Sequence, residues 1–343
     1  MSFCKIIKKL AYSATMLVTA LATTSCDQVL DNGYGDCTVR YYIDFQYDYN
    51  VMEVDAFAKQ VKSVAVYAFD ENGKLAYQQT DEGAHLALDG YKMQVAWCPT
   101  DYTVVAWCGM AGNTTFSLPQ TIIGETTLEQ LKCRMQRSAT NEVGELMALF
   151  HGMETNPLPV NPEDKLNPTV VMPLVKNTNT IRIVLQDQGG EPIKADQFEF
   201  TITEDNGLMA HDNQLLPDDA LTYRPFHTLQ GSVDMTETAT KASSDNSTAN
   251  VVIADLSMGR IMADKQPRLK VRNRETGETV FSIPLRDYLL LVKSHYKTHW
   301  TDQEYLDRQD EYNMTFFLDD DSKWLSAYIL INSWRVVLQD AEL

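Results

Sequence analysis

The sequence predicts an all-β protein made of two tandem antiparallel β-sandwich domains that follow a lipoprotein signal peptide. Short segments recur in which every second residue is hydrophobic, which is the period of a strand with one buried face. The chain has 343 residues, enough for about two domains. It also contains 16 Tyr, 12 Phe and 5 Trp, and aromatic residues favour strands.

The acidic charge of the chain excludes one class of partner. The sequence has 47 acidic and 29 basic residues, which gives a formal net charge of −18. Contacts with phosphate groups require a basic surface, so we expect no nucleic-acid partner. The hydrophobic fraction of 44% is too high for a disordered acidic tail.

The N-terminus resembles a bacterial lipoprotein leader. Lys5, Lys8 and Lys9 form a basic start, and the apolar stretch of residues 10–22 is shorter than the roughly 20 residues that a bilayer span needs. Small residues then lead to Cys26, so we predict signal-peptide cleavage before this residue and lipidation of its sulfur. The alternative is an ordinary signal peptide followed by an incidental cysteine.

The sequence divides into four expected segments. Residues 1–25 form the signal peptide, and residues 26–36 form a short, polar, lipidated tether. Four of the thirteen residues in 156–168 are prolines, a density that disfavours both helices and central strands. We therefore predict an N-terminal sandwich over residues 37–160 and a C-terminal sandwich over residues 161–343, each with its own core.

Local patterns predict the first elements of the N-terminal sandwich. Alternation over residues 39–47 predicts a strand, and Asp55 to Val61 predicts one or two helical turns. Asn72-Gly73 separates the apolar runs 64–69 and 75–77, which predicts a hairpin because both residues tolerate positive φ.

The following segment predicts a second hairpin and a short helical turn. Residues 91–108 alternate on both sides of Pro99-Thr100, and proline presets φ for the first central position of a turn. Thr127 and Gln130 resemble a capping box, which predicts a brief helical turn before a strand over 131–135.

Alternation resumes after the proline-rich segment. A helical segment is expected over residues 287–292, and a Thr/Ser/Ala-rich loop over residues 234–250. The expected strands are 181–185, 198–202, 251–253, 269–271, 314–318 and 328–337.

Four cysteines remain beyond the leader and Cys26: Cys37, Cys98, Cys108 and Cys133. In an oxidising compartment they allow three pairings. Cys98 and Cys108 would lie far apart along the predicted second hairpin, beyond the roughly 7 Å that a disulfide can bridge. Free thiols and disulfides both remain open.

No catalytic or metal-binding motif is evident. The sequence lacks GxSxG, P-loop and GxGxxG patterns, so we expect no enzyme and no cofactor. His295 and His299 have a helical spacing without the intervening Glu of a zincin, so we expect a solvated connector there. The run Asp319–Asp321 lacks the alternating ligands and glycine of a calcium loop, so we expect no metal.

An ordered series of motifs resembles the Bacteroidales fimbrial anchor lipoproteins, the subunits that fix major or minor fimbriae to the outer membrane. The resemblance extends from Cys26 to the C-terminus and implies a transthyretin-like β-sandwich in each half. The motifs are Cys26, Asp36-Cys37, Phe45–Asn50, Asp55–Phe57, Val64–Gly73, Tyr102–Trp107, Leu149–Gly152, Gln303–Gln309 and Ile331–Trp334.

The resemblance implies a non-enzymatic, surface-exposed lipoprotein that anchors fimbriae to the cell outer membrane and limits their length. Its partners would be a fimbrial shaft subunit (fimbrillin) and outer-membrane lipid, the latter through acylated Cys26. One alternative is a surface glycan-binding lipoprotein, which requires exposed aromatic platforms, whereas Trp97 and Trp107 fall in strand patterns that bury them. Another alternative is a fimbrial tip adhesin, but a retained lipid anchor favours the base.

The C-terminal strand is the predicted contact with the shaft. Ile329, Ile331, Trp334 and Val336 belong to an apolar alternating segment that ends close to the chain terminus. Such a strand can be exchanged between subunits, because strand addition joins main-chain groups at a sheet edge. The alternative is that this strand closes its own sandwich and makes no external contact.

Overall fold

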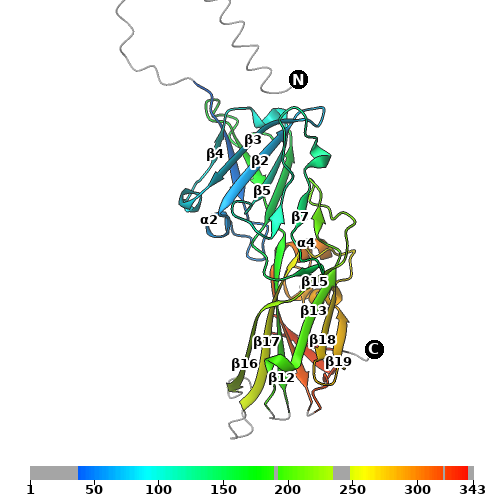
Figure 1. The fold of residues 1–343 in the computed structure, drawn as a ribbon. Coiled ribbons are helices and arrows are strands. Elements are labelled where there is room, and N and C mark those ends of the chain that lie inside the picture. Colours follow the sequence, from blue (N-terminus) through cyan, green and yellow to red (C-terminus); the bar gives the residue numbers. More distant parts are fainter. Residues whose placement is uncertain (1–37, 189–191, 235–247, 320, 339–343) are drawn as a thin grey trace, which may run out of the picture.

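The computed structural model describes residues 38–188, 192–234, 248–319 and 321–338. Over these residues the predicted all-β fold is confirmed, with five sheets and only short helical segments. The predicted signal peptide and tether, including Cys26, lie outside the described residues, as do Cys37 and most of the predicted 234–250 loop. Two β-rich halves are stacked end to end (Figure 1).

The N-terminal half packs a three-stranded sheet, ordered β10-β1-β4, against a five-stranded sheet, ordered β11-β9-β5-β2-β3. Ile43, Phe45, Val66 and Phe150 belong to the core of this half. The strands are β1 (Tyr41–Gln46), β2 (Ser63–Phe69), β3 (Leu75–Glu82), β4 (Met93–Val95), β5 (Thr103–Cys108), β9 (Phe150–Thr155), β10 (Thr169–Pro173) and β11 (Val175–Lys176). The helical segments are α2 (Phe57–Gln60), η1 (Ala84–Ala87), η2 (Pro99–Asp101) and η3 (Leu128–Gln130).

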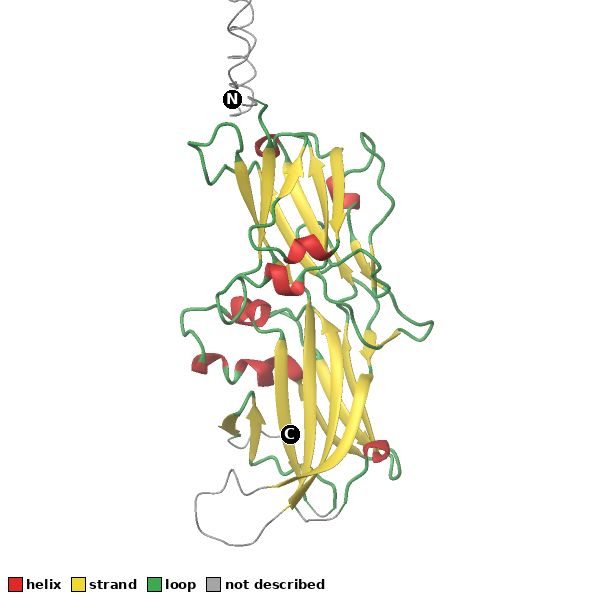
Figure 2. Ribbon diagram, turned by 90° about the vertical axis from the view of Figure 1, so that its left-hand side faces the viewer, coloured by secondary structure: helices red, strands yellow, loops and turns green. Residues whose placement is uncertain are grey.

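The C-terminal half packs a six-stranded sheet, ordered β16-β17-β12-β20-β21-β22, against a five-stranded sheet, ordered β19-β18-β13-β15-β8. Its strands are β8 (Glu142–Val143), β12 (Thr178–Asp187), β13 (Phe198–Glu204), β15 (Leu221–Tyr223), β16 (Pro225–Asp234), β17 (Thr248–Gly259), β18 (Arg268–Asn273), β19 (Thr279–Pro284), β20 (Glu311–Leu318), β21 (Tyr328–Ile331) and β22 (Trp334–Val337). The helical segments are η4 (Ala195–Gln197), α3 (Leu285–Leu290), η6 (Lys293–His295) and α4 (Asp302–Arg308). Figure 2 shows that helical segments lie beside the sheets.

A small third sheet joins strands from both parts of the chain in the order β14-β7-β6. Its strands are β6 (Phe116–Ser117), β7 (Cys133–Met135) and β14 (Leu208–Met209). Among the strands of the described ranges, three pairings are parallel, namely β1 with β10, β12 with β20, and β15 with β8. Alternation along single strands did not indicate these parallel pairings, because side chains alternate with a period of two residues in both parallel and antiparallel strands.

Local turn chemistry is well predicted. The Asn72-Gly73 turn connects β2 and β3, and Gly73 takes a positive φ of 69°. Asp70 supports this turn, because its Oδ1 accepts the backbone N–H groups of Asn72 and Lys74 at 2.9 Å. The capping box at Thr127 is also present, at the start of η3.

The predicted hairpin over residues 91–108 is wrong. β4 pairs with β1 in one sheet, whereas β5 pairs with β2 and β9 in the other. Between them η2 begins at Pro99 and carries the chain from one sheet to the other. Alternation shows that each strand has one buried face. It does not show whether two strands pair in one sheet or lie in the two opposite sheets of a sandwich.

The boundary predicted between residues 160 and 161 does not match the strand pairing. β10 and β11 follow that point, yet they pair with β1 and β9 of the N-terminal half. β8 precedes it, yet it pairs with β15 of the C-terminal half. The proline-rich segment is therefore a loop within the N-terminal half, and the chain enters the C-terminal sheets at Thr178.

The expectation of a separate core in each half is not met. Phe69 and Trp107, from the N-terminal sheet, belong to the same buried cluster as Ile181 and Phe316 of the C-terminal sheets. The faces of β2 and β5 that carry these side chains extend the C-terminal core across the junction between the halves. A second cluster remains inside the N-terminal half alone.

A buried ion pair lies at this junction. Arg260 follows β17, and its Nε and Nη2 atoms each donate to a carboxylate oxygen of Asp307 in α4 at 2.7 Å. Its Nη1 donates to the carbonyl oxygen of Asn213 at 2.6 Å. The two side chains are only 10% and 5% exposed, so each charge depends on the other for compensation.

Replacing Arg260 by Met should lower the free energy of unfolding by about 3–5 kcal/mol, because it leaves the Asp307 carboxylate buried without its partner. The double variant Arg260→Met/Asp307→Leu should be more stable than the single variant. Urea unfolding followed by tryptophan fluorescence measures both. As a control, Lys323→Met breaks an exposed pair with Asp321 and should cost less than about 1 kcal/mol. Equal losses for Arg260→Met and this control would contradict the assignment.

His151 of β9 is a second buried polar group at the junction. Its Nε2 lies 2.8 Å from the carbonyl oxygen of His211, and its ring packs edge-on against Trp107 with centroids 4.6 Å apart. Burial lowers the pKa of His151 from its ordinary value of 6.5 to about 4. The unfolded chain therefore takes up a proton at a higher pH than the folded protein does.

We expect His151 to reduce the free energy of unfolding by up to about 3 kcal/mol as the pH falls from about 6.5 to 4, because the unfolded state binds the extra proton. His151→Gln should flatten this dependence in urea titrations across that window. Burial raises the pKa of Glu204 to about 7, which stabilises the folded state towards low pH. The control Glu204→Gln should therefore steepen the loss. A slope that His151→Gln leaves unchanged would contradict the prediction.

Candidate functional site: an open sheet edge

The predicted C-terminal strand is in fact a hairpin of two short strands. β21 and β22 pair antiparallel across a turn at Asn332 and Ser333, which have φ values of 48° and 71°. The prediction of one strand over residues 328–337 was therefore wrong. One signal could have shown this: the apolar positions that share a face shift from odd to even numbers between Ile331 and Trp334, as a two-residue turn requires.

The hairpin brings the four predicted contact residues together on one face but exposes them unequally. The register places Ile331 opposite Trp334 and Ile329 opposite Val336. Ile329 and Ile331 are fully buried in the core, and Val336 is half-buried against it. Only Trp334, which is 44% exposed, presents a large surface to solvent. The two isoleucines therefore hold the hairpin in its own sheet.

Further contacts fasten the hairpin. Asn332 exchanges two hydrogen bonds with the backbone of Asn313 in β20, each 2.8 Å long. The Trp334 ring stacks on His295 with centroids 4.0 Å apart and an angle of 2° between the planes. The Arg335 guanidinium lies 4.2 Å from the ring centre of Tyr328. Because these contacts hold the hairpin in place, we expect it to stay in its own sheet. A partner strand would then add to the edge of β22.

β22 offers main-chain groups for such an addition. It is the outermost strand of the six-stranded sheet, and within the described ranges it pairs with β21 alone. Ile331 and Trp334 flank a two-residue turn and form a hydrogen-bonded pair, so the alternate residues Arg335 and Val337 direct their N–H and C=O groups outward. The Val337 side chain is 65% exposed.

The opposite edge of the same sheet is less suited to strand addition. β16 carries the exposed side chains of Phe226 and Leu229. However, it starts at Pro225, which lacks an N–H, and its register with β17 shifts between Pro225 and His227. Proline and bulges are devices that blunt sheet edges. β22 contains neither device.

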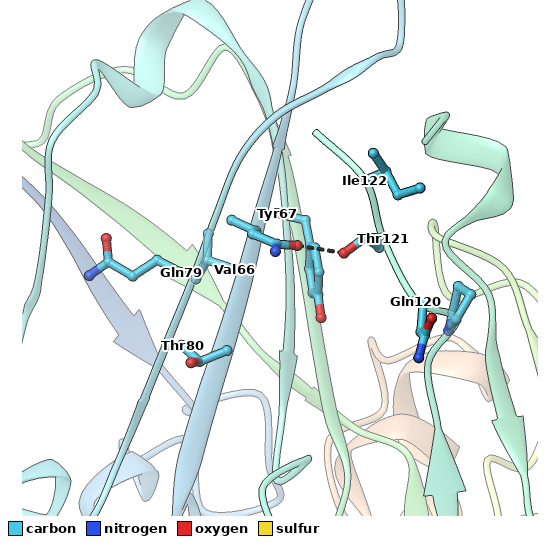
Figure 3. Close-up of a pocket in the computed structure, with 9 residues that line it drawn as sticks. Val66, Tyr67, Gln79, Thr80, Gln120, Thr121 and Ile122 are labelled. Carbon is cyan, nitrogen blue, oxygen red and sulfur yellow. Dashed lines mark hydrogen bonds between the residues drawn. The ribbon is translucent and has the colours of Figure 1, made fainter. Parts of the chain in front are cut away.

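A separate pocket of about 550 Å³ lies on the N-terminal half (Figure 3). β2 and β3 form one wall, and residues 119–122 form the other. The Thr121 hydroxyl donates to Oε1 of Gln78 across the pocket (Figure 3). No charged side chain lines it: the lining residues are Val66, Tyr67, Gln78, Gln79, Thr80, Pro119, Gln120, Thr121 and Ile122. Amide and hydroxyl groups of this kind both donate and accept hydrogen bonds.

Three residues of the motifs considered for metal binding, His295, His299 and Asp319, make other contacts. The structure holds His295 against Trp334 and His299 near Trp300, so the two imidazoles do not share a helical face. Asp319 instead stabilises a turn, because its Oδ1 accepts the N–H groups of Asp321 and Lys323. In the described part of the chain, no three His, Cys, Asp or Glu side chains are grouped so that they could hold a metal ion.

A further prediction concerns the exposure of two tryptophans. Trp97 and Trp107 are buried, as their strand patterns predicted. Over the described ranges, no helix has both the length and the apolar character needed to cross a membrane.

Comparison with known proteins identifies the family to which these stacked sandwiches belong. The family model of fimbrillin-A associated anchor proteins Mfa1 and Mfa2 matches residues 34–340. The chain therefore belongs to this family, as its motifs predicted. Membership places it among fimbrium-associated proteins of the cell envelope.

Individual relatives agree with this assignment. The chain is 28% identical over 120 residues to the minor fimbrium anchoring subunit Mfa2 of Porphyromonas gingivalis, a match that covers 34% of this chain and 36% of that protein. It therefore spans only about a third of that relative's length.

Solved structures extend the likeness to most of the chain. A candidate polysaccharide-binding protein from Bacteroides thetaiotaomicron is 31% identical, with a TM-score of 0.73 over 88% of this chain and 99% of that one. A candidate adhesin from the same organism is also 31% identical, with a TM-score of 0.74 over 88% and 98% of the two chains. The fimbrial anchor protein Mfa2 from P. gingivalis, 17% identical, shares the fold with a TM-score of 0.60 over 88% and 100%.

Proposed function

We propose that this protein is a non-enzymatic base subunit that anchors a fimbrial shaft to the cell outer membrane. The observation that carries the proposal is the open edge of β22 in a member of a fimbrial anchor family. A fimbrial shaft subunit (fimbrillin) would lay an extended strand beside β22 and pair with the outward groups of Arg335 and Val337. Strand addition of this kind obtains its affinity from main-chain hydrogen bonds.

Acylated Cys26 would supply the attachment to outer-membrane lipid. Each buried methylene contributes about 0.8 kcal/mol, so two or three acyl chains hold even an acidic protein at a membrane surface. The first described residue, Thr38, leads into β1 of the N-terminal half, whereas β22 belongs to the C-terminal half (Figure 1). The shaft would therefore extend away from the membrane. A base subunit that binds one shaft subunit would also end the shaft there and so limit its length.

Val337→Pro tests the contact with the shaft. Proline removes the outward N–H of Val337 but none of the hydrogen bonds within the hairpin, and its φ suits an edge strand. We expect cells to shed their shafts while the folded variant stays in the outer membrane. Val337→Ala is the matched control, because it retains the N–H and should retain the shafts. Cys26→Ala should release the protein together with its shafts.

Electron microscopy and immunoblots of cells, membranes and medium measure these outcomes, and thermal melts confirm folding. Normal shaft retention by a folded Val337→Pro variant would refute the role of β22. A Cys26→Ala protein that remains in the outer membrane, with shafts attached, would refute the lipid anchor.

The uncharged pocket favours a second candidate function, the binding of a neutral glycan. Its amide and hydroxyl groups match the mixed donors and acceptors of sugar hydroxyls, and the Tyr67 ring lies beside them. A structural relative with 31% identity is described as a candidate polysaccharide-binding protein. In this function the protein would act as a surface glycan-binding lipoprotein or as a fimbrial tip adhesin.

Calorimetry of the purified protein with a panel of neutral oligosaccharides tests this function. Gln120→Ala should weaken binding about tenfold, because one hydrogen bond to a sugar hydroxyl is lost. Gln188→Ala removes an exposed amide far from the pocket and should leave the affinity unchanged. Equal affinities for the two variants, or no binding of any neutral glycan to the wild type, would rule the pocket out.

A further inference from the structure

A second hollow, of about 320 Å³, adjoins the uncharged pocket on the N-terminal half. Pro119 lines both of them, and the wall formed by residues 119–122 continues into the hollow through Leu118 and Ser117. Both volumes fall within the range of about 300–1,000 Å³ that small-molecule sites occupy. A ligand that extends out of the pocket past Pro119 would therefore enter the hollow.

The outer face of the small third sheet forms the floor of this hollow. Cys133 of β7 is buried, whereas the residues on either side of it, Lys132 and Arg134, are exposed and line the hollow. Residues two apart in a strand project to the same side, so the two basic side chains form a row. Ser117 of β6 and Leu208 of β14 pair with Arg134 and complete the floor.

The charges of this row are poorly compensated. Arg134 is 53% exposed and lies 3.5 Å from Asp218, which also pairs with the more buried Arg137. Within the described ranges, no carboxylate lies at ion-pair distance from Lys132. The chain as a whole has a formal net charge of −18 and repels free anions. The row therefore suits an anionic group on a ligand that neighbouring contacts also hold.

We propose that the pocket and the hollow form one extended site for an acidic oligosaccharide. This inference rests on the second candidate function, the binding of a glycan, and names the class of glycan. Neutral sugar units would occupy the uncharged pocket, and a carboxylate or sulfate group on the adjoining unit would bind Lys132 and Arg134. Hydrogen bonds between ionised groups are stronger than neutral ones, and a guanidinium group can bind either anion through two parallel hydrogen bonds.

Calorimetry with a matched pair of oligosaccharides tests the proposal on the purified protein. A hyaluronan hexasaccharide alternates a carboxylated sugar with a neutral one, and carboxyl reduction removes its charges but keeps its length. We expect the acidic form to bind about tenfold more tightly than the reduced form, because only the acidic form pairs with the basic row. Added salt should diminish this preference, since the row is exposed to solvent.

Substitutions in the row should act on the acidic form alone. Lys132→Met and Arg134→Met should each weaken its binding about threefold, and the double variant should bind both forms equally. Lys323→Met is the matched control, because it removes an exposed lysine of the C-terminal half and should change neither affinity. Thermal melts confirm that the variants are folded. Chondroitin sulfate and its desulfated form, measured in the same way, separate sulfate from carboxylate as the preferred anion.

Three outcomes would overturn the proposal: equal affinities of the wild type for both hyaluronan forms, an acid preference that the double variant retains, or no binding of any of the four probes. Equal affinities would refute the acid preference and still support the glycan function. Binding of the acidic form alone would support the proposal and refute a purely neutral glycan as the ligand. The panel of neutral oligosaccharides judges the glycan function separately.

Discussion

One buried guanidinium group links several elements near the junction between the two halves. Arg260 binds Asp307 in α4 and, through the carbonyl oxygen of Asn213, the loop that follows β14. Asn213 in turn exchanges amide hydrogen bonds of 2.7 and 3.0 Å with Asn177, the residue between β11 and β12. One charge therefore connects a helix, a loop and the point at which the chain crosses between the halves. A buried network of this kind is specific because every member needs its partners.

The shared core makes this junction stiff rather than hinged. Trp107 of the N-terminal sheet packs within the cluster that fills the C-terminal sandwich, and β7 and β8 pair with strands from later in the chain. Arg308 adds a contact across the junction, because its guanidinium lies 4.1 Å from the ring centre of Tyr49. Relative motion of the halves would have to break strand pairs and expose apolar surface together. In the proposed anchoring role, tension would pass from one end of the subunit to the other through this coupled junction.

Sequence patterns predicted the turns and caps that depend on neighbouring residues. They missed the strand pairings that depend on residues far apart in the chain. The Asn72-Gly73 turn and the Thr127 capping box depend on local backbone chemistry, and both were predicted correctly. The pairing of β4 with β1, and of β10 with β1 across more than a hundred residues, depends on contacts that no local pattern encodes. The prolines at residues 157–168 do mark a break in secondary structure. They do not mark the end of a domain, because the next two strands return to the N-terminal sheets.

The structure moves the proposed contact from apolar side chains to main-chain groups of the same C-terminal segment. Hydrophobic alternation identifies the side chains that a strand buries, so it selected Ile329 and Ile331, which the protein uses for its own core. A sheet edge is recognised through its main chain, and which main-chain groups stay unpaired depends on strand order and register. The strand order and register are known only from the structure, which places β22 beyond β21. They identify the outward main-chain groups as those of Arg335 and Val337. Arg335 and Val337, which alternate with the predicted contact residues Trp334 and Val336, are therefore the residues whose backbone a partner strand could reach.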